Sequence, residues 1–216
     1  ADTITKNSAI LRGSVDAKGT TLSSVQFCYD TTDAFTNCAS HTYNLTAPTS
    51  GWTTGVNTIS QAVTGLNSST TYFFKVMTVS NLGSVESTSL NFKTLSVLSF
   101  DSNGGSAVDP ISYATGSSVS LSGSTPIWIG HTFLGWFASG GTTAVATNYA
   151  VPGTTDQTLT AHWSLDVYNV YFDENLGSAV SDATYTVDAR TINDPGTPTR
   201  NGYTFAGWWT SDTGGT

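Results

Sequence analysis

Two stretches of this chain decide its fold, because each repeats the other. Leu98-Ser-Phe-Asp-Ser-Asn-Gly-Gly-Ser-Ala-Val108 is followed 72 residues later by Val170-Tyr-Phe-Asp-Glu-Asn-Leu-Gly-Ser-Ala-Val180. At the same offset, Gly130-His-Thr-Phe-Leu-Gly-Trp136 matches Gly202-Tyr-Thr-Phe-Ala-Gly-Trp208. A constant offset, with the spacing between the motifs preserved, indicates two copies of one folding unit.

The matched residues are typical of β-strands joined by tight turns. Leu98 and Phe100 alternate as on one face of a strand, and so do Val170 and Phe172. The Asn and Gly residues that follow are turn formers, because Asn tolerates left-handed backbone and Gly adopts it without a steric penalty. We expect Gly135 to allow a close backbone approach beside the neighbouring Trp ring.

These motifs resemble the Listeria–Bacteroides repeat, also called the internalin B-type repeat. The first copy, residues 97–164, shows the F-D-x-N-x-G-S-A-V opening, the G-x-T-F-x-G-W centre with His131 in place of Tyr, and an L-x-A-x-W ending. The second copy, residues 167–216, has Leu176 where the family has Gly, and it stops before the closing strands. The resemblance implies a small β-grasp-like unit that occurs in tandem on secreted and surface-anchored bacterial proteins.

Residues 1–95 are expected to form a separate β-sandwich, because short strands follow one another there without helical periodicity. Within them, Gly13 is expected to mark a β-bulge, and Tyr72, Phe74 and Val76 should face the core. The expected strands are Ala9 to Asp16, Ser24 to Thr31, His41 to Thr46, Thr58 to Gly65, Thr71 to Ser80 and Ser87 to Thr94.

Gly65-Leu-Asn-Ser-Ser-Thr-Thr-Tyr72 resembles the G-L-x-P-x-T-x-Y corner of fibronectin type III domains, with Asn67-Ser68 where the family has x-Pro. The resemblance implies that the Tyr72 hydroxyl bonds to backbone near this corner. The whole chain is thus expected to be mostly β, with a fibronectin III-like sandwich followed by two β-grasp-like repeats. The linkers, residues 95–96 and 164–167, are too short to be flexible.

The composition limits the classes of partner. The chain has 216 residues, a net charge of −8 and only 10% charged residues, which argues against a nucleic-acid surface and against a basic membrane-binding face. No run approaches the roughly 18 apolar residues of a membrane helix. Abundant Thr, frequent Gly turns and low charge instead favour β modules held outside a cell.

Two cysteines, Cys28 and Cys38, lie ten positions apart. Val25, Phe27 and Tyr29 alternate on one side of a strand, so we expect Cys28 on the other side, in a disulfide near the surface. Such a short clip would contribute roughly 2–3 kcal/mol. Two free thiols are the alternative if the compartment is reducing, whereas a metal site lacks a second pair of ligands.

Residues able to carry catalysis, a cofactor or a metal are not grouped in any known motif. The three histidines, His41, His131 and His162, are isolated in the sequence, and His131 aligns with Tyr203, which favours aromatic packing. Asp101-Ser-Asn103 could place two oxygens on Ca²⁺ but lacks the later carboxylate of a cage. We therefore interpret it as a turn and expect neither an enzyme nor a cofactor.

The tryptophans divide into two groups. Trp136, Trp163 and Trp208 belong to the repeat motifs and are expected in the cores. The other three are the candidates for contact with a ligand such as a sugar ring: Trp52, Trp128 and Trp209. Trp128 aligns with Arg200, and Trp209 aligns with Phe137. The exchange of Trp for Arg indicates partial exposure, although a ring that covers its own sheet is the favoured interpretation.

Together these features predict a non-enzymatic, extracellular bacterial surface segment that acts as a stalk, spacer or assembly module. The expected partners are copies of the chain itself or other cell-surface components. A glycan- or protein-binding adhesin module is one alternative. The other is an accessory region of a secreted hydrolase whose catalytic domain lies elsewhere.

Overall fold

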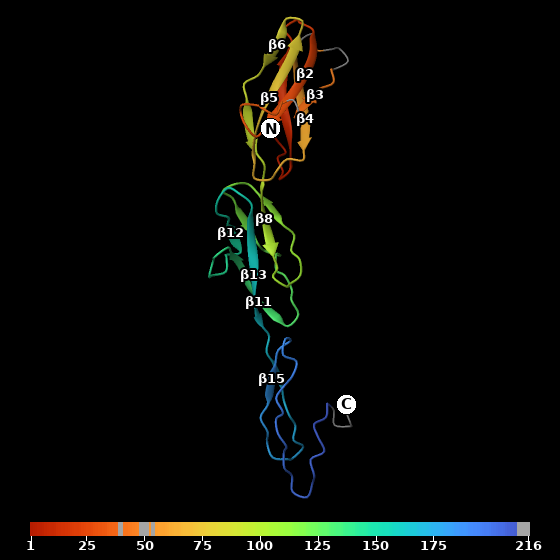
Figure 1. Cartoon of the computed structure of the whole chain (residues 1–216), viewed down its shortest axis with the longest axis vertical. Coiled ribbons are helices and arrows are strands. Elements are labelled where there is room, and N and C mark those ends of the chain that lie inside the picture. The colour runs from red at the N-terminus through yellow and green to blue at the C-terminus, as the bar shows by residue number, and fades with distance from the viewer. Residues whose placement is uncertain (39–40, 48–51, 53–54, 211–216) are drawn as a thin grey trace.

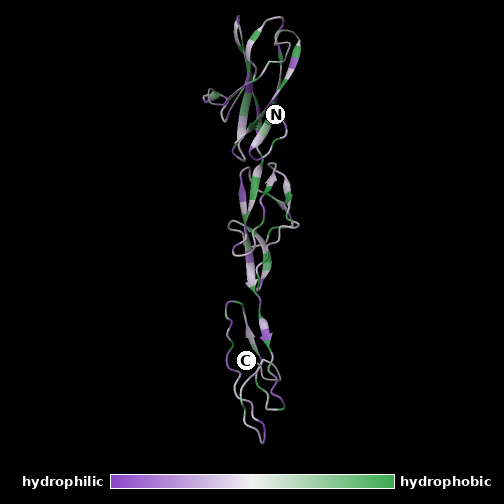
Figure 2. Ribbon diagram, turned by 90° about the vertical axis from the view of Figure 1, so that its right-hand side faces the viewer, coloured by the Kyte–Doolittle hydropathy of each residue, from purple (hydrophilic) through white to green (hydrophobic). Residues whose placement is uncertain are grey.

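The computed structural model describes residues 1–38, 41–47, 52 and 55–210, and the protein is an elongated rod built of β-strands (Figure 1). The chain runs from one end of the rod to the other, with the N-terminal part, the first repeat copy and the second copy in line. Hydrophobic segments are spread along the strands of the whole rod rather than gathered at one end (Figure 2). Within the described residues no helical segment is long or apolar enough to cross a membrane.

Residues 1–95 form two antiparallel sheets that enclose one core. In the smaller sheet, β1 (Ser8–Asp16) pairs along its whole length with β4 (Val56–Thr64). The larger sheet has the order β3 (Thr42–Asn44), β2 (Leu22–Asp30), β5 (Thr71–Ser80) and β6 (Gly83–Glu86), and β7 (Leu90–Lys93) also pairs with β5. Leu11 and Val63 from the first sheet and Phe27 and Phe74 from the second lie in one buried cluster. The two sheets therefore pack face to face.

Alternation along the sequence predicted the faces of β5 correctly, because Tyr72, Phe74 and Val76 are buried. The bulge expected at Gly13 is absent, since the register of β1 with β4 runs through this residue without a shift. A Cβ at Gly13 would lie 3.0 Å from Cγ2 of Val76 in the opposite sheet. Glycine is needed there for close approach between sheets rather than for an irregular backbone.

The strand expected over residues 87–94 is shorter in the structure, where it spans Leu90–Lys93. The chain forms β6 before this segment and β7 within it, and both pair with the long strand β5 at different places. At the start of β5, where β7 pairs with it, the Tyr72 hydroxyl accepts a hydrogen bond from the backbone amide of Asn67 at 3.0 Å. This is the contact that the corner motif implied.

The first repeat copy contains a mixed sheet with β13 in the interior. The sheet order is β11 (His131–Ala138), β13 (Gln157–Leu165), β8 (Ser96–Asp101) and β9 (Ile111–Tyr113). β13 runs antiparallel to β11 and parallel to β8. A second small sheet pairs β10 (Ser118–Ser120) with β12 (Asn148–Ala150).

The core of the first copy lies on one face of this sheet. Leu98, Leu159 and Trp136 are buried together, and Trp163 packs against them from a half-buried position. The register of β11 with β13 shifts between Phe133 and Gly135. A Cβ at Gly135 would lie 2.6 Å from Cβ of Ala144, so this glycine does allow a close approach of the chain.

The second copy repeats the beginning of the first in detail. β14 (Tyr168–Val170) pairs with β15 (Ala183–Tyr185), and Tyr168 opposite Tyr185 corresponds at the 72-residue offset to Ser96 opposite Tyr113. Residues 203–209, the counterpart of β11, do not form a strand, and no described strand pairs with them. The expectation that Trp208 lies in a core is wrong in this structure. The Trp208 ring is only partly covered. In the first copy, β13 pairs with the strand that carries the equivalent Trp136.

Candidate functional site

The three tryptophans considered as ligand contacts lie in different surroundings. Trp52 is 6% exposed and belongs to the core of the first two sheets, so its ring is not available to a ligand. The Trp128 ring stacks on His131 with centroids 3.7 Å apart and meets Trp163 edge-on at 5.6 Å. Trp209 is 60% exposed. The structure therefore brings no two of these three rings together as a binding surface.

Trp128 covers the turn that opens the first repeat. A Cβ at Gly104 would lie 2.6 Å from the Trp128 ring, which leaves room for glycine only. In the second copy Arg200 takes the place of Trp128 and donates from Nη1 to the Asn175 carbonyl at 2.9 Å, while Leu176 occupies the glycine position. The exchange of Trp128 for Arg200 thus accompanies the exchange of Gly104 for Leu176 in the turn. The contact between the Trp128 ring and Gly104 explains why the two positions differ together.

The three histidines each pack against an aromatic ring. His41 lies 4.9 Å from Tyr29, and His162 stacks on Phe137 at 3.9 Å. Asp101 accepts a hydrogen bond from the backbone amide of Asn103, which is the turn contact expected of this pair. Within the described parts of the chain, no group of three His, Cys, Asp or Glu side chains is placed to hold a metal ion.

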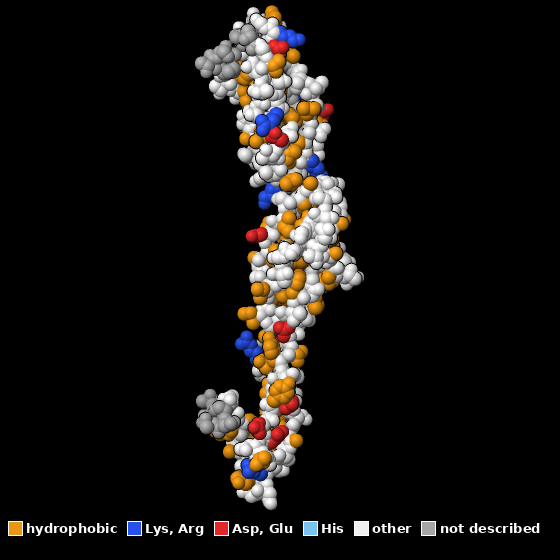
Figure 3. Space-filling model, turned by 180° about the vertical axis from the view of Figure 1, so that it is seen from behind, with side chains coloured by type: hydrophobic (Ala, Val, Ile, Leu, Met, Phe, Trp, Pro, Cys, Tyr) orange, Lys and Arg blue, Asp and Glu red, His pale blue; other side chains and the backbone are white. Residues whose placement is uncertain are grey.

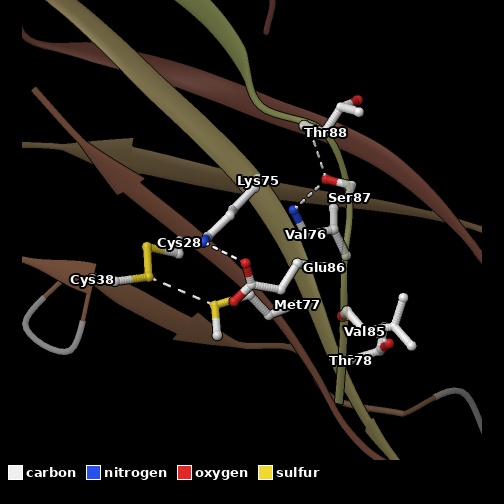
Figure 4. Close-up of polar contacts among 10 residues, drawn as sticks. All are labelled: Cys28, Cys38, Lys75, Val76, Met77, Thr78, Val85, Glu86, Ser87 and Thr88. Atoms are coloured by element: carbon white, nitrogen blue, oxygen red, sulfur yellow. Dashed lines mark hydrogen bonds and ion pairs between the residues drawn. A yellow bond between two sulfur atoms is a disulfide. The ribbon is translucent and has the colours of Figure 1, made fainter. Parts of the chain in front are cut away.

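Cys28 and Cys38 are joined by a disulfide, with their Cα atoms 5.4 Å apart (Figure 4). Cys28 is fully buried, which corrects the expectation of a surface position. Its side of β2 is covered because the following loop folds back over it. Met77 lies beside Cys38, with 3.6 Å between their sulfur atoms, and Lys75 pairs with Glu86 at 2.6 Å on the same face.

Asp30 fastens the loop that the disulfide closes. It is buried, and its carboxylate accepts hydrogen bonds from the backbone amides of Asn37 at 2.8 Å and Thr31 at 2.6 Å. The bond from Asn37 is the largest cause that holds the pKa of Asp30 below its ordinary value. At the preceding residue, Tyr29, burial and the nearby Tyr43 raise the pKa of the side chain to about 12. This cluster stabilises one end of the first unit and presents no reactive group.

The most extensive polar contacts between units lie at the junction of residues 1–95 with the first repeat. Asp156 accepts hydrogen bonds from the Ser68 hydroxyl at 2.5 Å and from the backbone amide of Val97 at 2.9 Å. Lys93 and the Ser69 hydroxyl both donate to the carbonyl of Thr154, at 2.6 and 2.5 Å. One loop of the first repeat is thereby bonded to both the corner and the last strand of the preceding unit.

The junction between the two repeat copies is built differently. Asp166 donates its backbone amide to the Gly130 carbonyl at 2.9 Å and accepts from the Thr132 hydroxyl at 2.6 Å. A Cβ at Gly130 would lie 2.1 Å from Val187 of the second copy, whereas the equivalent Gly202 has open space around it. Gly130 is therefore a contact point between units, where any side chain would collide.

Sequence reasoning did not predict these junction residues. Only the shortness of the linkers indicated restricted rotation, whereas Ser and Asp in loops carry no signal of their partner in another unit. Charge provides no alternative site on the face drawn in Figure 3, where Lys and Arg side chains are scattered singly along the rod. The junctions are thus the best-defined candidate for the functional feature of this chain.

Comparison with known proteins finds one family. The model of the Listeria-Bacteroides repeat domain matches residues 97–162 and 168–216. Among curated proteins, two provisionally named membrane proteins of Evansella cellulosilytica, one of them described as Gly-rich, are 37% and 35% identical over 112 residues, or 52% of this chain. Internalin H of Listeria monocytogenes is 35% identical over 89 residues, or 40% of this chain.

These relatives are much longer than this chain. The matched segments cover 13% and 17% of the two Evansella proteins and 16% of internalin H. No solved structure matches the chain.

Proposed function

This chain belongs to the Listeria-Bacteroides repeat family, and from that premise we propose that it is a semi-rigid spacer on the bacterial cell surface. The junction between residues 1–95 and the first repeat carries the proposal. A spacer holds what lies beyond it at a defined distance only if its units do not rotate freely about their linkers. The relatives named as membrane proteins and as an internalin support a location at or beyond the cell envelope.

The units of the proposed rod are a fibronectin III-like sandwich over residues 1–95 and two β-grasp-like repeats over residues 97–164 and 167–216. The two-sheet core and the Tyr72–Asn67 corner bond support the first assignment. The sheet in which β13 lies between β11 and β8 supports the second. In this arrangement the chain adds length and separates its neighbours, and its partners are other copies or other surface components.

The bonds of Asp156 restrict rotation because they join three segments at once: the corner of the first unit, the start of β8 and the loop before β13. Hydrogen bonds to a charged group are worth about 1.5–3 kcal/mol each when sheltered. Asp156 is on the surface, so the lower end of that range or less applies. Together with the bonds to Thr154, this is enough to favour one relative orientation of the two units.

The proposal is tested by measuring whether the two units tumble together. Residual dipolar couplings of amides in β2 and β5 and of amides in β8 and β13 should fit one common alignment tensor in the wild-type chain. Asp156→Ala should require two separate tensors, whereas Asp109→Ala, an exposed Asp of the same repeat away from the junction, should behave as wild type. Independent tensors in the wild-type chain would contradict the spacer function.

Glycan binding by an adhesin module is the second candidate, and the exposure of Trp209 favours it. An exposed indole can stack on a sugar ring. Isothermal titration with soluble cell-wall and host oligosaccharides should then show binding that Trp209→Ala removes. If heat changes are the same for the wild type and the variant, this candidate is excluded.

A further inference from the structure

The chain has two cysteines and one methionine, and the structure brings all three sulfur atoms together in the first unit (Figure 4). Cys28 lies in β2, Met77 lies in β5, and Cys38 lies in the loop after β2. The Sγ atom of Cys38 is 3.6 Å from the Sδ atom of Met77, although 39 positions separate them in the sequence. We call these three residues the sulfur cluster.

The register of the larger sheet explains why the cluster forms. Cys28 lies directly opposite Lys75 in the ladder of β2 with β5, and Met77 follows two residues later on the same face of β5. Cys38 approaches this face from the loop after β2. Cys28 is fully buried, whereas Cys38 and Met77 are half-buried. The cluster is therefore reachable from the surface on the side of Cys38 and Met77.

The backbone holds both cysteines in place independently of the disulfide. Cys28 lies within β2, which pairs with β3 on one side and with β5 on the other. The amide of Cys38 donates to the Phe35 carbonyl at 3.3 Å, and its carbonyl accepts from the amide of His41 at 3.1 Å. The hydrogen bonds that the buried Asp30 accepts from this loop add to these. Both cysteines should therefore keep their positions when the bond between their sulfur atoms is cleaved.

Once the disulfide is cleaved, the cluster offers two thiolates and one thioether. Thiolate and thioether sulfur are soft ligands, and together they select Cu(I). A structural zinc site instead takes four ligands from Cys, His and carboxylate side chains. Within the part of the chain that the structure describes, no His, Asp or Glu joins the two cysteines in a group of three. The donor set thus fits a soft monovalent ion with three sulfur ligands.

The charge around the cluster also suits this ion. A Cu⁺ ion held by two thiolates carries a net charge of −1, and a partly buried charge needs compensation. The Lys75 ammonium lies on the same face, over the Phe35 ring at 4.4 Å, with its side chain only 14% exposed. Its partner Glu86 is 48% exposed, so solvent screens the carboxylate more than the ammonium. Lys75 is therefore placed to offset the charge of the occupied cluster.

We propose that the reduced chain binds one Cu(I) ion through Cys28, Cys38 and Met77. The disulfide is the closed form of the site, because its two sulfur atoms are bonded to each other and neither is a thiolate. A small thiol opens it: two RSH molecules become RSSR, the Cys28–Cys38 bond breaks, and each cysteine gains one hydrogen. Binding of Cu⁺ then displaces the two thiol protons. The inference goes beyond the spacer function and does not depend on it.

The experiment uses the 216-residue chain, reduced with dithiothreitol in the absence of oxygen and freed of reductant by gel filtration. Cu(I) is titrated in competition with bicinchoninate, whose coloured Cu(I) complex fades as the protein takes up the ion. X-ray absorption at the copper edge counts the sulfur neighbours. Amide hydrogen exchange in β2 and β5 reports whether the reduced chain keeps its fold.

The reduced chain should bind one Cu(I) with three sulfur neighbours and unchanged protection of β2 and β5, and the disulfide form should bind none. Affinity should rise with pH, because binding releases protons. Met77→Leu keeps the volume of the side chain but should lower the affinity at least about tenfold, since loss of an outer-shell partner alone costs about 10–100-fold. Val79→Leu, two residues farther along β5, should bind as the wild type does.

Four results would overturn the proposal. The first is that the reduced wild type binds Cu(I) no more tightly than the double variant Cys28→Ser, Cys38→Ser. The second is equal affinity of the wild type and Met77→Leu, or only two sulfur neighbours in the wild type, either of which would remove Met77 from the site. The third is equal binding by the disulfide form. The fourth is loss of amide protection in β2 and β5 on reduction, which would show that the cluster exists only in the disulfide form.

Discussion

The same substitution made at equivalent positions of the two copies should have very different effects on stability. Trp136 is 4% exposed, packs against Phe100 and Phe133, and donates its indole N–H to the Ser124 carbonyl at 2.6 Å. Trp208 makes the corresponding contacts, but its ring is partly exposed and its indole lies 3.4 Å from the acceptor. The difference in destabilisation between Trp136→Ala and Trp208→Ala therefore measures how much burial of the ring under β13 contributes to stability.

Removal of a buried Trp ring costs about 3–5 kcal/mol. The Ser124 carbonyl, itself buried, loses its donor in Trp136→Ala and adds about 1 kcal/mol. A unit the size of the first repeat has roughly 3–10 kcal/mol of stability in total. Trp136→Ala should therefore bring the first repeat close to unfolding, whereas Trp208→Ala should cost about 1 kcal/mol or less, because little of its ring is taken out of water.

Amide hydrogen exchange is the suitable assay, because a chain of several units does not unfold in one step. The free energy of opening is read from the slowest amides of β8, β11 and β13, with amides of β2 and β5 as the internal reference. In Trp136→Ala, opening of the first group should become easier by about 4–6 kcal/mol while the reference stays unchanged. A loss below about 1 kcal/mol at Trp136, or equal losses at the two positions, would refute the reasoning.

Two further predictions concern the turn under Trp128 and the buried carboxylate. Gly104→Leu should destabilise the first repeat by about 1–3 kcal/mol, because the new side chain collides with the Trp128 ring. Adding Trp128→Arg should recover most of the lost stability in thermal unfolding, since the second copy combines Leu176 with Arg200. No recovery would show that positions 104 and 128 are not coupled. Because the pKa of Asp30 is lowered in the folded state, the stability that it contributes is present above its ordinary value of 3.8 and is lost as the pH falls through the lowered value. Denaturant unfolding between about pH 2 and pH 6 should show a smaller loss in acid for Asp30→Asn than for the wild type, and equal acid sensitivity would contradict this assignment.

Local features of the sequence were sufficient for much of the fold. The 72-residue offset predicted the two copies, and the structure pairs Tyr168 with Tyr185 as it pairs Ser96 with Tyr113. Alternation predicted which face of β5 is buried. Both succeed because strand periodicity and turn chemistry depend on neighbours a few residues away.

Other features were decided only by tertiary structure. Cys28 is buried because the loop after β2 folds back over it, and Trp52 is buried in the core between the two sheets. A glycine is needed at position 13 because Val76 of the opposite sheet lies too close for a side chain there. The parallel pairing of β13 with β8 joins residues about sixty positions apart, and no local pattern encodes it.

The candidate site illustrates the same division. Its residues are ordinary Ser and Asp side chains, and Asp156 has a role because Ser68, 88 residues earlier in the chain, comes within hydrogen-bonding distance. Burial behaves likewise: Trp136 is buried in the core of the first copy, where β13 pairs with its strand β11. Sequence specifies the local conformation of each copy, and contacts between segments far apart in the chain decide which side chains are buried and which units are held together.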